Sequence, residues 1–508
     1  MDTFNNFLQG SITLFSDPIN ILIFLGGIVG GMLFGAIPGV SMLTLAAILL
    51  PFTAHLTAEQ GIMLFSVIYC TGVYGGAITA ILFNIPGAPE NAPTAFDGYP
   101  MTKNGQAGKA VGAAVMCSAL GGVVSTIIMM VATAPIADWA ISAFGPPEIF
   151  ALVFFGLAVA ASVGAKTFWK GWLSILIGLM VAVVGLDPVG GIARYDFGMP
   201  YLLAGIHFIP TILGFFAVSE IFVQAEKKVR GSYTAPKLSV DFPTLKELIE
   251  HKVAIVRSMC IGFFCGILPG IGATLAAFMG YNEAVRWSKK PEEFGTGKLE
   301  GVISSETANN AATGAAMIPL LALGLPGGAL TAMMVGVFQM HDMDPGPLVF
   351  LNSADLVWVV FAAMFFANCS ILLIGWLETK TIINLLRIPF QFLAPMILLL
   401  ATVGAYAVRG LTIDVVVMFL AGVIGFFLRR SGYSVAGIVL GLILGKIGEQ
   451  TFAQAMQMLH FEWSGFLDRP IAAGLLGVGF VTLAASIYSE FFKKQPGTPP
   501  SEDSHASE

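Results

Sequence analysis

The same ten-residue pattern occurs twice in this chain, as Gly31-Met-Leu-Phe-Gly35-Ala-Ile-Pro38-Gly39-Val40 and as Gly262-Phe-Phe-Cys-Gly266-Ile-Leu-Pro269-Gly270-Ile271. In both copies two glycines four residues apart precede a Pro-Gly pair, and the copies are offset by 231 residues. Proline removes a backbone N–H donor and glycine tolerates unusual backbone angles. Because both copies lie in apolar segments, the pattern predicts two matched breaks in membrane helices.

The match continues on the C-terminal side of each copy. After one deletion, Thr44-Leu-Ala-Ala corresponds to Thr274-Leu-Ala-Ala, and a second Pro-Gly follows in each half, in Asn84-Ile-Pro86-Gly87 and Gly324-Leu-Pro326-Gly327. With 59 glycines in the chain, one such element could recur by chance. Two elements in the same order favour a true internal repeat.

The amino-acid composition indicates the environment, water or lipid, in which this repeat folds. The 508 residues have a mean hydropathy of +0.83, and only 11% are charged, whereas soluble proteins carry about 25%. Apolar runs at 110–134, 172–186, 354–377 and 415–428 approach the ~20 residues that span a bilayer. The sequence therefore predicts an all-α polytopic membrane protein with about 12 transmembrane segments.

The distribution of cations predicts the topology. None precedes Lys103, whereas seven Lys and Arg residues lie between 227 and 257, so we expect this region in the cytoplasm and the N-terminus outside. An odd number of crossings then separates them, which makes the repeat an inverted one. We predict a first repeat over 1–224, a cytoplasmic linker over 225–252, a second repeat with terminal helices over 253–492 and a disordered tail over 493–508.

The charges around the second copy also indicate its shape. The apolar stretch 253–280 has cations at both ends, including Lys252 and Arg286, and it is too short for two full crossings. A re-entrant hairpin with its tip at Pro269-Gly270 keeps both cation clusters inside. Its counterpart at Pro38-Gly39 would enter from outside, and movement of the pair would give elevator-type transport. A single kinked and tilted helix at each place is the alternative.

The four breaks also predict a binding site. Backbone groups freed at a break cannot face lipid, and a half-helix N-terminus offers N–H donors that suit a carboxylate. Ordinary helix kinks are the alternative interpretation. The predicted substrate-binding residues are Pro38, Gly39, Ser41, Thr44, Asn84, Pro86, Gly87, Pro269, Gly270, Gly272, Thr274, Asn309, Asn310, Thr313, Pro326 and Gly327.

A polar run, Ser304-Ser-Glu-Thr-Ala-Asn-Asn-Ala-Ala-Thr313, leads into the fourth break. Amides and hydroxyls can hold a carboxylate without the cost of burying several cations; a hydrophilic loop with a helix cap is the alternative. Glu306 is a candidate for coupling to Na+ or H+, against a role as a cap or structural acceptor. No cofactor is predicted, and the histidines lack metal-ligand spacing, so a Na+ ion carried near the breaks is the one metal considered.

At these residues the chain resembles the TctA family, the large membrane subunit of bacterial tripartite tricarboxylate transporters. The matching features are Gly35-Ala-Ile-Pro-Gly-Val, Asn84-Ile-Pro-Gly-Ala-Pro-Glu, Gly301-Val-Ile-Ser-Ser-Glu-Thr-Ala-Asn-Asn-Ala and Leu323-Gly-Leu-Pro-Gly. The resemblance covers about the first 490 residues. It implies a multi-pass carrier of citrate-like carboxylates in the bacterial inner membrane, driven by an ion gradient. It also implies a small TctB-like membrane subunit and a periplasmic TctC-like solute-binding protein.

Other functions fit the sequence less well. A single-component carboxylate carrier or a channel is the alternative within transport, although a channel favours a continuous polar stripe over paired helix breaks. A membrane-embedded enzyme acting on lipid or peptide lacks a nucleophile–base or metal set, and the HExxH, GxSxG and GxxxxGK[ST] motifs do not occur. The net charge of −6 provides no basic surface for nucleic acid.

Overall fold

The computed structural model describes residues 2–37, 40–163, 167–188, 190–226, 242–270, 272–385 and 390–492. The helices are α1 (Asp2–Ser16), α2 (Pro18–Ala36), α3 (Met42–Leu49), α4 (Ala58–Phe83), α5 (Ala92–Lys103), α6 (Ala107–Ala143), α7 (Pro146–Val163), α8 (Phe168–Ala182), α9 (Phe208–Leu213), α10 (Ser219–Glu226), α11 (Leu245–Glu250), α12 (Lys252–Ile267), α13 (Gly272–Trp287), α14 (Leu299–Ala315), α15 (Met317–Leu323), α16 (Ala329–Met340), α17 (Pro347–Asn352), α18 (Ala354–Leu385), α19 (Phe390–Arg409), α20 (Thr412–Arg430), α21 (Val435–Met458) and α22 (Pro470–Phe492). Short helical turns η1 to η6 span Leu50–His55, Pro89–Asn91, Pro200–Leu202, Gly214–Val218, Pro291–Glu293 and Trp463–Phe466, and strands β1 (Gly185–Leu186) and β2 (Ala193–Arg194) form an antiparallel pair with Gly185 opposite Arg194.

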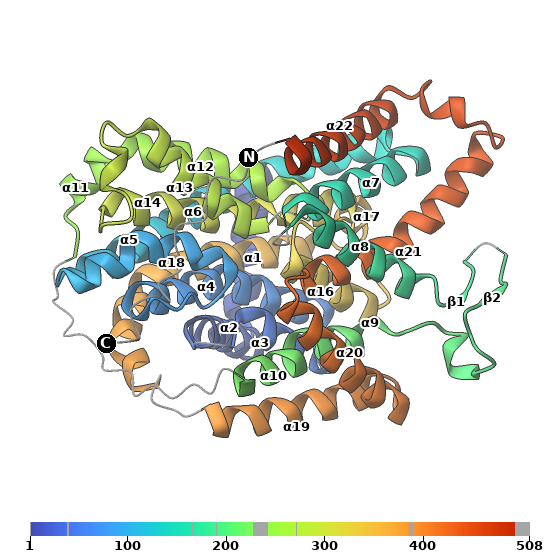
Figure 1. The fold of residues 1–508 in the computed structure, drawn as a ribbon, viewed down its shortest axis with the longest axis horizontal. Helices are drawn as coiled ribbons and strands as arrows, with labels where there is room; N and C mark the ends of the chain where they lie inside the picture. Colours follow the sequence, from blue (N-terminus) through green and yellow to red (C-terminus); the bar gives the residue numbers. More distant parts are fainter. Residues whose placement is uncertain are drawn as a thin grey trace.

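The predicted all-helical membrane fold is confirmed (Figure 1). Within the described ranges, nine helical segments are long and apolar enough to cross a membrane, and four shorter apolar helices accompany them. The apolar runs at 110–134, 354–377 and 415–428 lie inside α6, α18 and α20. The exact number of spans, about 12, stays a prediction.

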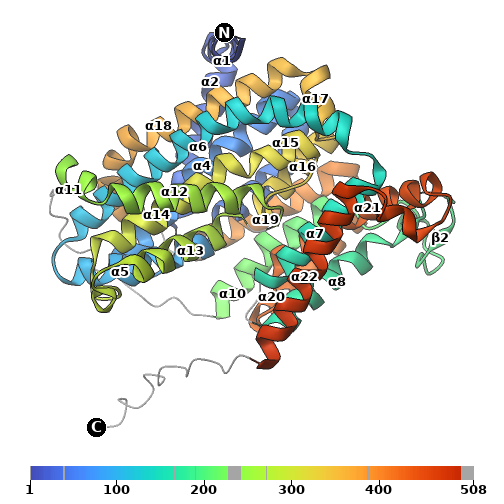
Figure 2. The same cartoon turned by 90° about the horizontal axis from the view of Figure 1, so that it is seen from above.

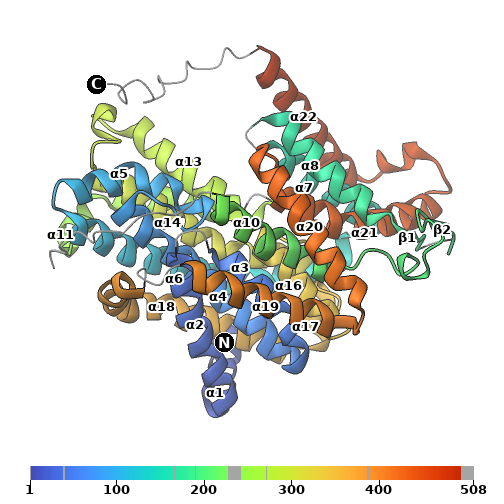
Figure 3. The ribbon, with the colours of Figure 1, turned by 60° about the horizontal axis from the view of Figure 1, so that its bottom comes forward.

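The helices form two bodies, seen side by side in Figures 2 and 3. The hairpin body contains α1–α6 and α12–α18: α2 packs on α4, α12 and α13 pack on α14, and α6 contacts both α14 and α18. The flanking body contains α7–α10 and α19–α22: α8 and α7 pack on α21, and α20 packs on α9 and α10. In α4, 94% of the most apolar window is buried, against 11% in α22, so α4 is central and α22 faces outward.

Helices α12 and α13 form an antiparallel hairpin rather than one kinked helix. The guanidinium of Arg257, near the start of α12, lies 5.9 Å from the ring of Trp287 at the end of α13. Farther along, the Sγ of Cys265 is 3.7 Å from the Sδ of Met279. A helical hairpin is therefore present, and its predicted re-entrant position in the membrane stays a prediction. Each arm has 16 residues, short of the ~20 that span a bilayer.

The two Pro-Gly copies end their preceding helices with the same backbone geometry. Ile37 caps α2 at φ −76°, ψ 118°, and Leu268 caps α12 at φ −75°, ψ 121°. Beyond the first break, α3 folds back toward α2. The close approach of the two helices is visible at Gly30, where an added Cβ would lie 3.2 Å from Cδ2 of Leu45. Pro38 and Gly39 themselves lie outside the described residues.

The second pair of breaks shows a matching geometry of its own. Asn84 ends α4 with φ 58°, and Gly324 ends α15 with φ 75°. The next residue then donates backward to a carbonyl in the same relative place: Ile85 N–H to Thr79 O at 3.3 Å, and Leu325 N–H to Pro319 O at 3.0 Å. Helices broken at matched sequence positions thus stop in matched conformations.

Part of the predicted linker is helical. Helix α11 follows residues 227–241, which lie outside the described ranges, and Glu247 on α11 pairs with Lys109 on α6. This ion pair connects the linker to the hairpin body. The predicted domain boundaries and the predicted disorder of the tail, 493–508, have no test in the described residues.

Candidate functional site

A cavity of about 610 Å3 is lined by described residues that lie next to the four breaks in the sequence. The hairpin body contributes residues next to the breaks, namely Ser41 to Leu43, Ile85 to Glu90, Ala92, Gly270, Gly272 to Thr274 and Gly328 to Leu330. The flanking body closes the other side with residues of α7, α10, α20 and α21. Segments up to several hundred residues apart in the chain therefore share one pocket.

Six of the predicted site residues line this cavity. They are Ser41, Pro86, Gly87, Gly270, Gly272 and Thr274. Pro269 sits behind the wall, 3.0 Å from a Cβ added at Gly156 of α7. Pro326 and Gly327 are buried, with Gly327 packed so closely on Ala316 that an added Cβ would approach it to 2.9 Å.

Gly270 shows why the hairpin tip requires glycine. Its φ is +83°, a left-handed conformation that L-residues rarely adopt. A Cβ there would lie 2.5 Å from the Cβ of Ala160 and 3.2 Å from the carbonyl oxygen of Gly156. The tip of the hairpin therefore touches α7 of the flanking body at van der Waals distance, at the edge of the cavity.

Two predicted residues point elsewhere. The hydroxyl of Thr44 donates to the carbonyl of Phe216 at 3.2 Å, in the flanking body. Asn84 is exposed and ends α4 in the left-handed conformation. Neither lines the cavity, so their predicted contact with substrate stays a prediction.

The polar run 304–313 is a buried helix, α14, and not a loop. Glu306 accepts hydrogen bonds from Thr94, from Ser118 at 2.9 Å and from the Asn309 amide at 3.3 Å. The Asn310 amide donates to Asn309 Oδ1 at 2.7 Å. A carboxylate surrounded by donors in this way is stabilised where it stands.

Glu306, Asn309, Asn310 and Thr313 of α14 lie outside the cavity lining. The Asn309 amide also reaches toward the backbone carbonyl of Glu90 at 3.4 Å, and the Thr313 hydroxyl donates to the Asn310 carbonyl at 2.8 Å. The network thus lies behind the second break and supports it. The predicted substrate contacts of Asn309, Asn310 and Thr313 remain untested.

The cavity also contains groups that the sequence interpretation missed. Arg429, at the end of α20, pairs with Glu220 of α10 and donates to the carbonyl of Phe215 at 3.0 Å. A guanidinium has five N–H donors in a planar fork that matches carboxylate geometry. Because Arg429 lines the cavity, it places a cation where an anion could bind.

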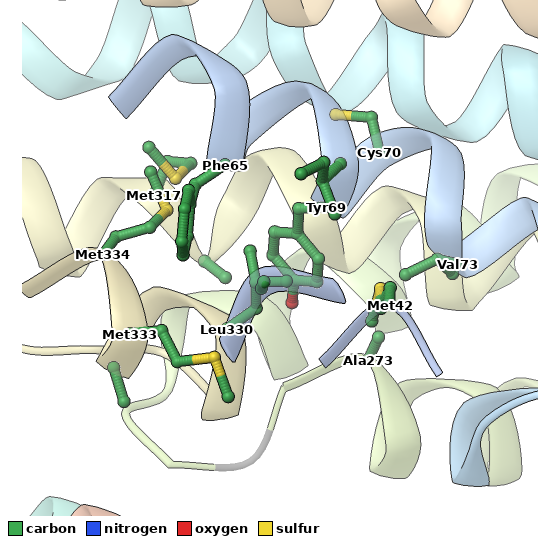
Figure 4. Close-up of a cluster of buried hydrophobic side chains, with 14 of the residues drawn as sticks. Met42, Phe65, Tyr69, Cys70, Val73, Ala273, Met317, Leu330, Met333 and Met334 are labelled. Carbon is green, nitrogen blue, oxygen red and sulfur yellow. The ribbon is translucent and has the colours of Figure 1, made fainter. Parts of the chain in front are cut away.

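Two residues outside the predicted set, Tyr69 and Glu90, also line the hairpin side of the cavity. Tyr69 is only 4% exposed and Glu90 only 5%. Figure 4 shows the Tyr69 ring extending from α4 with its hydroxyl between Leu330 on one side and Met42 and Ala273 on the other. The hydroxyl therefore lies where α3, α13 and α16 begin.

Helix N-termini surround the same space. Helices α13 and α16 begin at Gly272 and Ala329, both at the cavity wall, and α21 begins behind Ser434, whose hydroxyl accepts from the Gly437 N–H at 3.0 Å. First-turn N–H groups lack intrahelical acceptors and carry partial positive charge. With Arg429, they make the cavity suited to a carboxylate. Among the described residues no group of three or more His, Cys, Asp and Glu could hold a metal ion.

The chain is similar to one protein family and to two proteins of one bacterium. The family model "Tripartite tricarboxylate transporter TctA family" matches residues 21–440. The chain is also similar to the "Uncharacterized 52.8 kDa protein in TAR-I ttuC' 3'region" of Agrobacterium vitis, at 34% identity over 97% of this chain and 98% of that protein. It is 35% identical to the "Uncharacterized protein in TAR-II ttuC' 3'region" of the same organism over 46% of this chain and 97% of that one. No solved structure matches.

Proposed function

Because the chain belongs to the tripartite tricarboxylate transporter TctA family, we propose that it carries a tricarboxylate or related carboxylate, such as citrate, across the bacterial inner membrane. The observation that carries this proposal is one cavity lined by residues next to all four breaks and by Arg429. Helix N-termini and a guanidinium recognise carboxylates through N–H donors and positive charge. The predicted site residues that line the cavity belong to this proposed binding site.

The proposal extends to coupling and partners. Transport is driven by a Na+ or H+ gradient, with the ion carried near the breaks. Glu306 and Glu90 are buried carboxylates near the second break. A small TctB-like membrane subunit and a periplasmic TctC-like binding protein complete the system, supported by the tripartite character of the family.

The architecture we infer is an inverted repeat of about 12 spans that moves by an elevator mechanism. The equal cap geometries of Ile37 and Leu268 support it, as do the matched ends of α4 and α15. The hairpin body would move against the flanking body, and the cavity between them would open to each side in turn. Inverted repeats with a midplane site at broken helices are common in secondary transporters.

Uptake of radiolabelled citrate into proteoliposomes tests the function. The full chain is reconstituted with the small membrane subunit, and the binding protein is added outside with a Na+ or a H+ gradient imposed. We expect accumulation that needs the gradient and all three proteins. Protein-free liposomes and liposomes with a collapsed gradient are the controls.

The same assay separates the alternatives. Concentrative uptake by the chain alone would favour a single-component carrier. Equilibration that is fast and independent of any gradient would favour a channel. Failure to move citrate or any other di- or tricarboxylate under all gradients would contradict the proposed function.

A further inference from the structure

We propose that Glu90 couples cation entry to substrate binding: a substrate carboxylate occupies the hairpin side of the cavity only when the Glu90 carboxylate carries a proton or a Na+ ion. This inference rests on the proposed function and assigns its coupling step to a residue outside the sequence-predicted site. Three features carry it, namely an uncompensated buried carboxylate, an unpaired hydroxyl and two helix starts at the same wall.

Glu90 is a buried carboxylate without a cationic partner in the described part of the chain. Its side chain accepts one long side-chain hydrogen bond, from the Thr274 hydroxyl at 3.5 Å, and interacts with its own backbone N–H. The cation of the cavity, Arg429, is paired with Glu220 on the opposite wall. An ionised carboxylate buried in this way is costly unless it gains a proton or a cation.

Tyr69 marks the ligand position beside Glu90. Its ring is almost fully buried, yet its hydroxyl has no hydrogen-bond partner among the described residues and opens into the cavity. A buried tyrosine hydroxyl normally has a partner. A Cβ added at Gly328, the residue that precedes α16, would lie 4.0 Å from this hydroxyl, so the unused donor points to the start of α16.

The starts of α13 and α16 supply the other donors. The Gly328 N–H donates to Thr331 Oγ1 at 2.8 Å, and the next two residues, Ala329 and Leu330, line the cavity with first-turn N–H groups that have no intrahelical acceptor. Gly272 and Gly328 lie against each other, with a Cβ added at Gly272 only 3.6 Å from the Gly328 Cα. A carboxylate held by these amides and by Tyr69 would share the cavity wall with the Glu90 carboxylate. Two negative charges in one largely buried cavity repel each other, because the surrounding dielectric is low.

The described residues around Glu90 offer no other source of positive charge. Its turn, η2, packs against α4, α5, α13 and α14. The titratable groups that these helices bury are Tyr69, Cys70, Tyr74, Asp97, Tyr281 and Glu306. The cations on α5 and α13, Lys103 and Arg286, lie at the helix ends, where they contact Tyr99 and Glu283.

Glu306 differs from Glu90 in the number of its hydrogen-bond donors and in its position outside the cavity lining. It accepts from three side-chain donors and does not line the cavity. Its charge is compensated without a bound cation, and a substrate would not sit beside it. Glu306 therefore provides the matched control for Glu90: a second buried glutamate near the same break.

Citrate binding to the purified full chain in nanodiscs tests the inference. The dissociation constant is measured between pH 6 and 8.5 in Na+-free buffer, and between 0 and 100 mM Na+ at pH 8, for the wild type, Glu90→Gln, Glu90→Asp and Glu306→Gln. Citrate titrates identically in all four series, so differences between proteins report on the chain. Thermal unfolding of each variant checks that it is folded.

We expect wild-type affinity to rise with proton or Na+ concentration, by up to about tenfold per pH unit for one linked proton. Whichever titration produces the rise identifies the ion. Glu90→Gln, which mimics the neutral state, binds about tenfold more tightly than wild type at pH 8 without Na+ and loses both dependences. Glu90→Asp and Glu306→Gln keep them.

Two results overturn the inference while leaving the proposed function intact. One is wild-type binding that responds to neither ion. The other is a dependence that disappears in Glu306→Gln but persists in Glu90→Gln. If the folded wild type binds neither citrate nor any other di- or tricarboxylate under every condition, the proposed function fails, and the inference fails with it.

Discussion

Two adjacent arginines at the end of α20 have different surroundings. Arg429 lines the cavity and donates to Glu220 and to Phe215. Arg430 pairs with Glu226 at 2.8 Å, and its side chain is 63% exposed outside the cavity lining. Neighbours in the sequence with the same charge can therefore have separate roles, and the pair provides a built-in control.

We predict that Arg429→Gln weakens citrate binding at least about tenfold, because a charge-assisted hydrogen bond contributes roughly 1.5–3 kcal/mol. Arg430→Gln should leave the dissociation constant within about twofold. Glu220→Gln removes the partner of Arg429 but keeps the cation, so it should preserve binding. Equal losses in Arg429→Gln and Glu220→Gln would instead assign Arg429 a structural ion pair, and calorimetry on the three purified variants distinguishes the outcomes.

At the level of single residues, the sequence could predict the break-lining positions but not the partners that face them. Ser41, Gly87 and Thr274 lie next to Pro-Gly pairs, which are local signals. Tyr69 lies inside an apolar helix and resembles any core aromatic residue. Arg429 beside Arg430 resembles a cation flanking a membrane span. Their roles depend on how residues of α20, α10 and α4 come to line one cavity, which no local pattern contains.

At the level of elements, the helix ends followed from the sequence. Proline and glycine stop α2, α4, α12 and α15 close to where the pattern predicts, because the cause is a missing N–H donor and a tolerated backbone angle. The composition of the run 304–313 did not decide between a loop and a helix. Ser, Thr and Asn favour loops and caps, yet here they form the buried helix α14, in which the hydroxyls of Ser305, Thr307 and Thr313 donate to carbonyls three or four residues earlier in the same helix.

The α12–α13 hairpin yields a prediction about its tip. Gly270→Leu should abolish citrate transport while the protein stays in the membrane, because the side chain would displace Ala160 and hold the hairpin away from α7. Gly295→Leu is the control. Its φ is +82°, nearly that of Gly270, but nothing lies within 4 Å of an added Cβ.

Both substitutions carry the same backbone strain, roughly 1–2 kcal/mol. The difference between them in proteoliposome uptake, normalised to the amount of protein reconstituted, therefore isolates the contact of the tip. Similar uptake in the two variants would mean that close packing at Gly270 is not needed for transport.

At the level of the whole molecule, composition predicted the membrane and the repeat predicted the matched breaks. The division into a hairpin body and a flanking body could not be predicted. It depends on how α7–α10 join α19–α22, segments that are separated in the sequence by the linker and by α12–α18 of the other body. The cavity forms between the two bodies. Its cationic wall, which contains Arg429, therefore could not be predicted either.

The last prediction concerns the orientation of the two halves. In a cysteine-free background, Val253→Cys and Trp287→Cys mark the open end of the α12–α13 hairpin, and Ala54→Cys marks the end of the α3–η1 segment; all three positions are exposed. Because cations flank the first two and none lies near residue 54, the positive-inside rule places 253 and 287 in the cytoplasm and 54 outside. A membrane-impermeant thiol reagent applied to intact cells should label only 54. Inside-out vesicles should reverse the pattern, and labelling of all three from one side would contradict the inverted repeat.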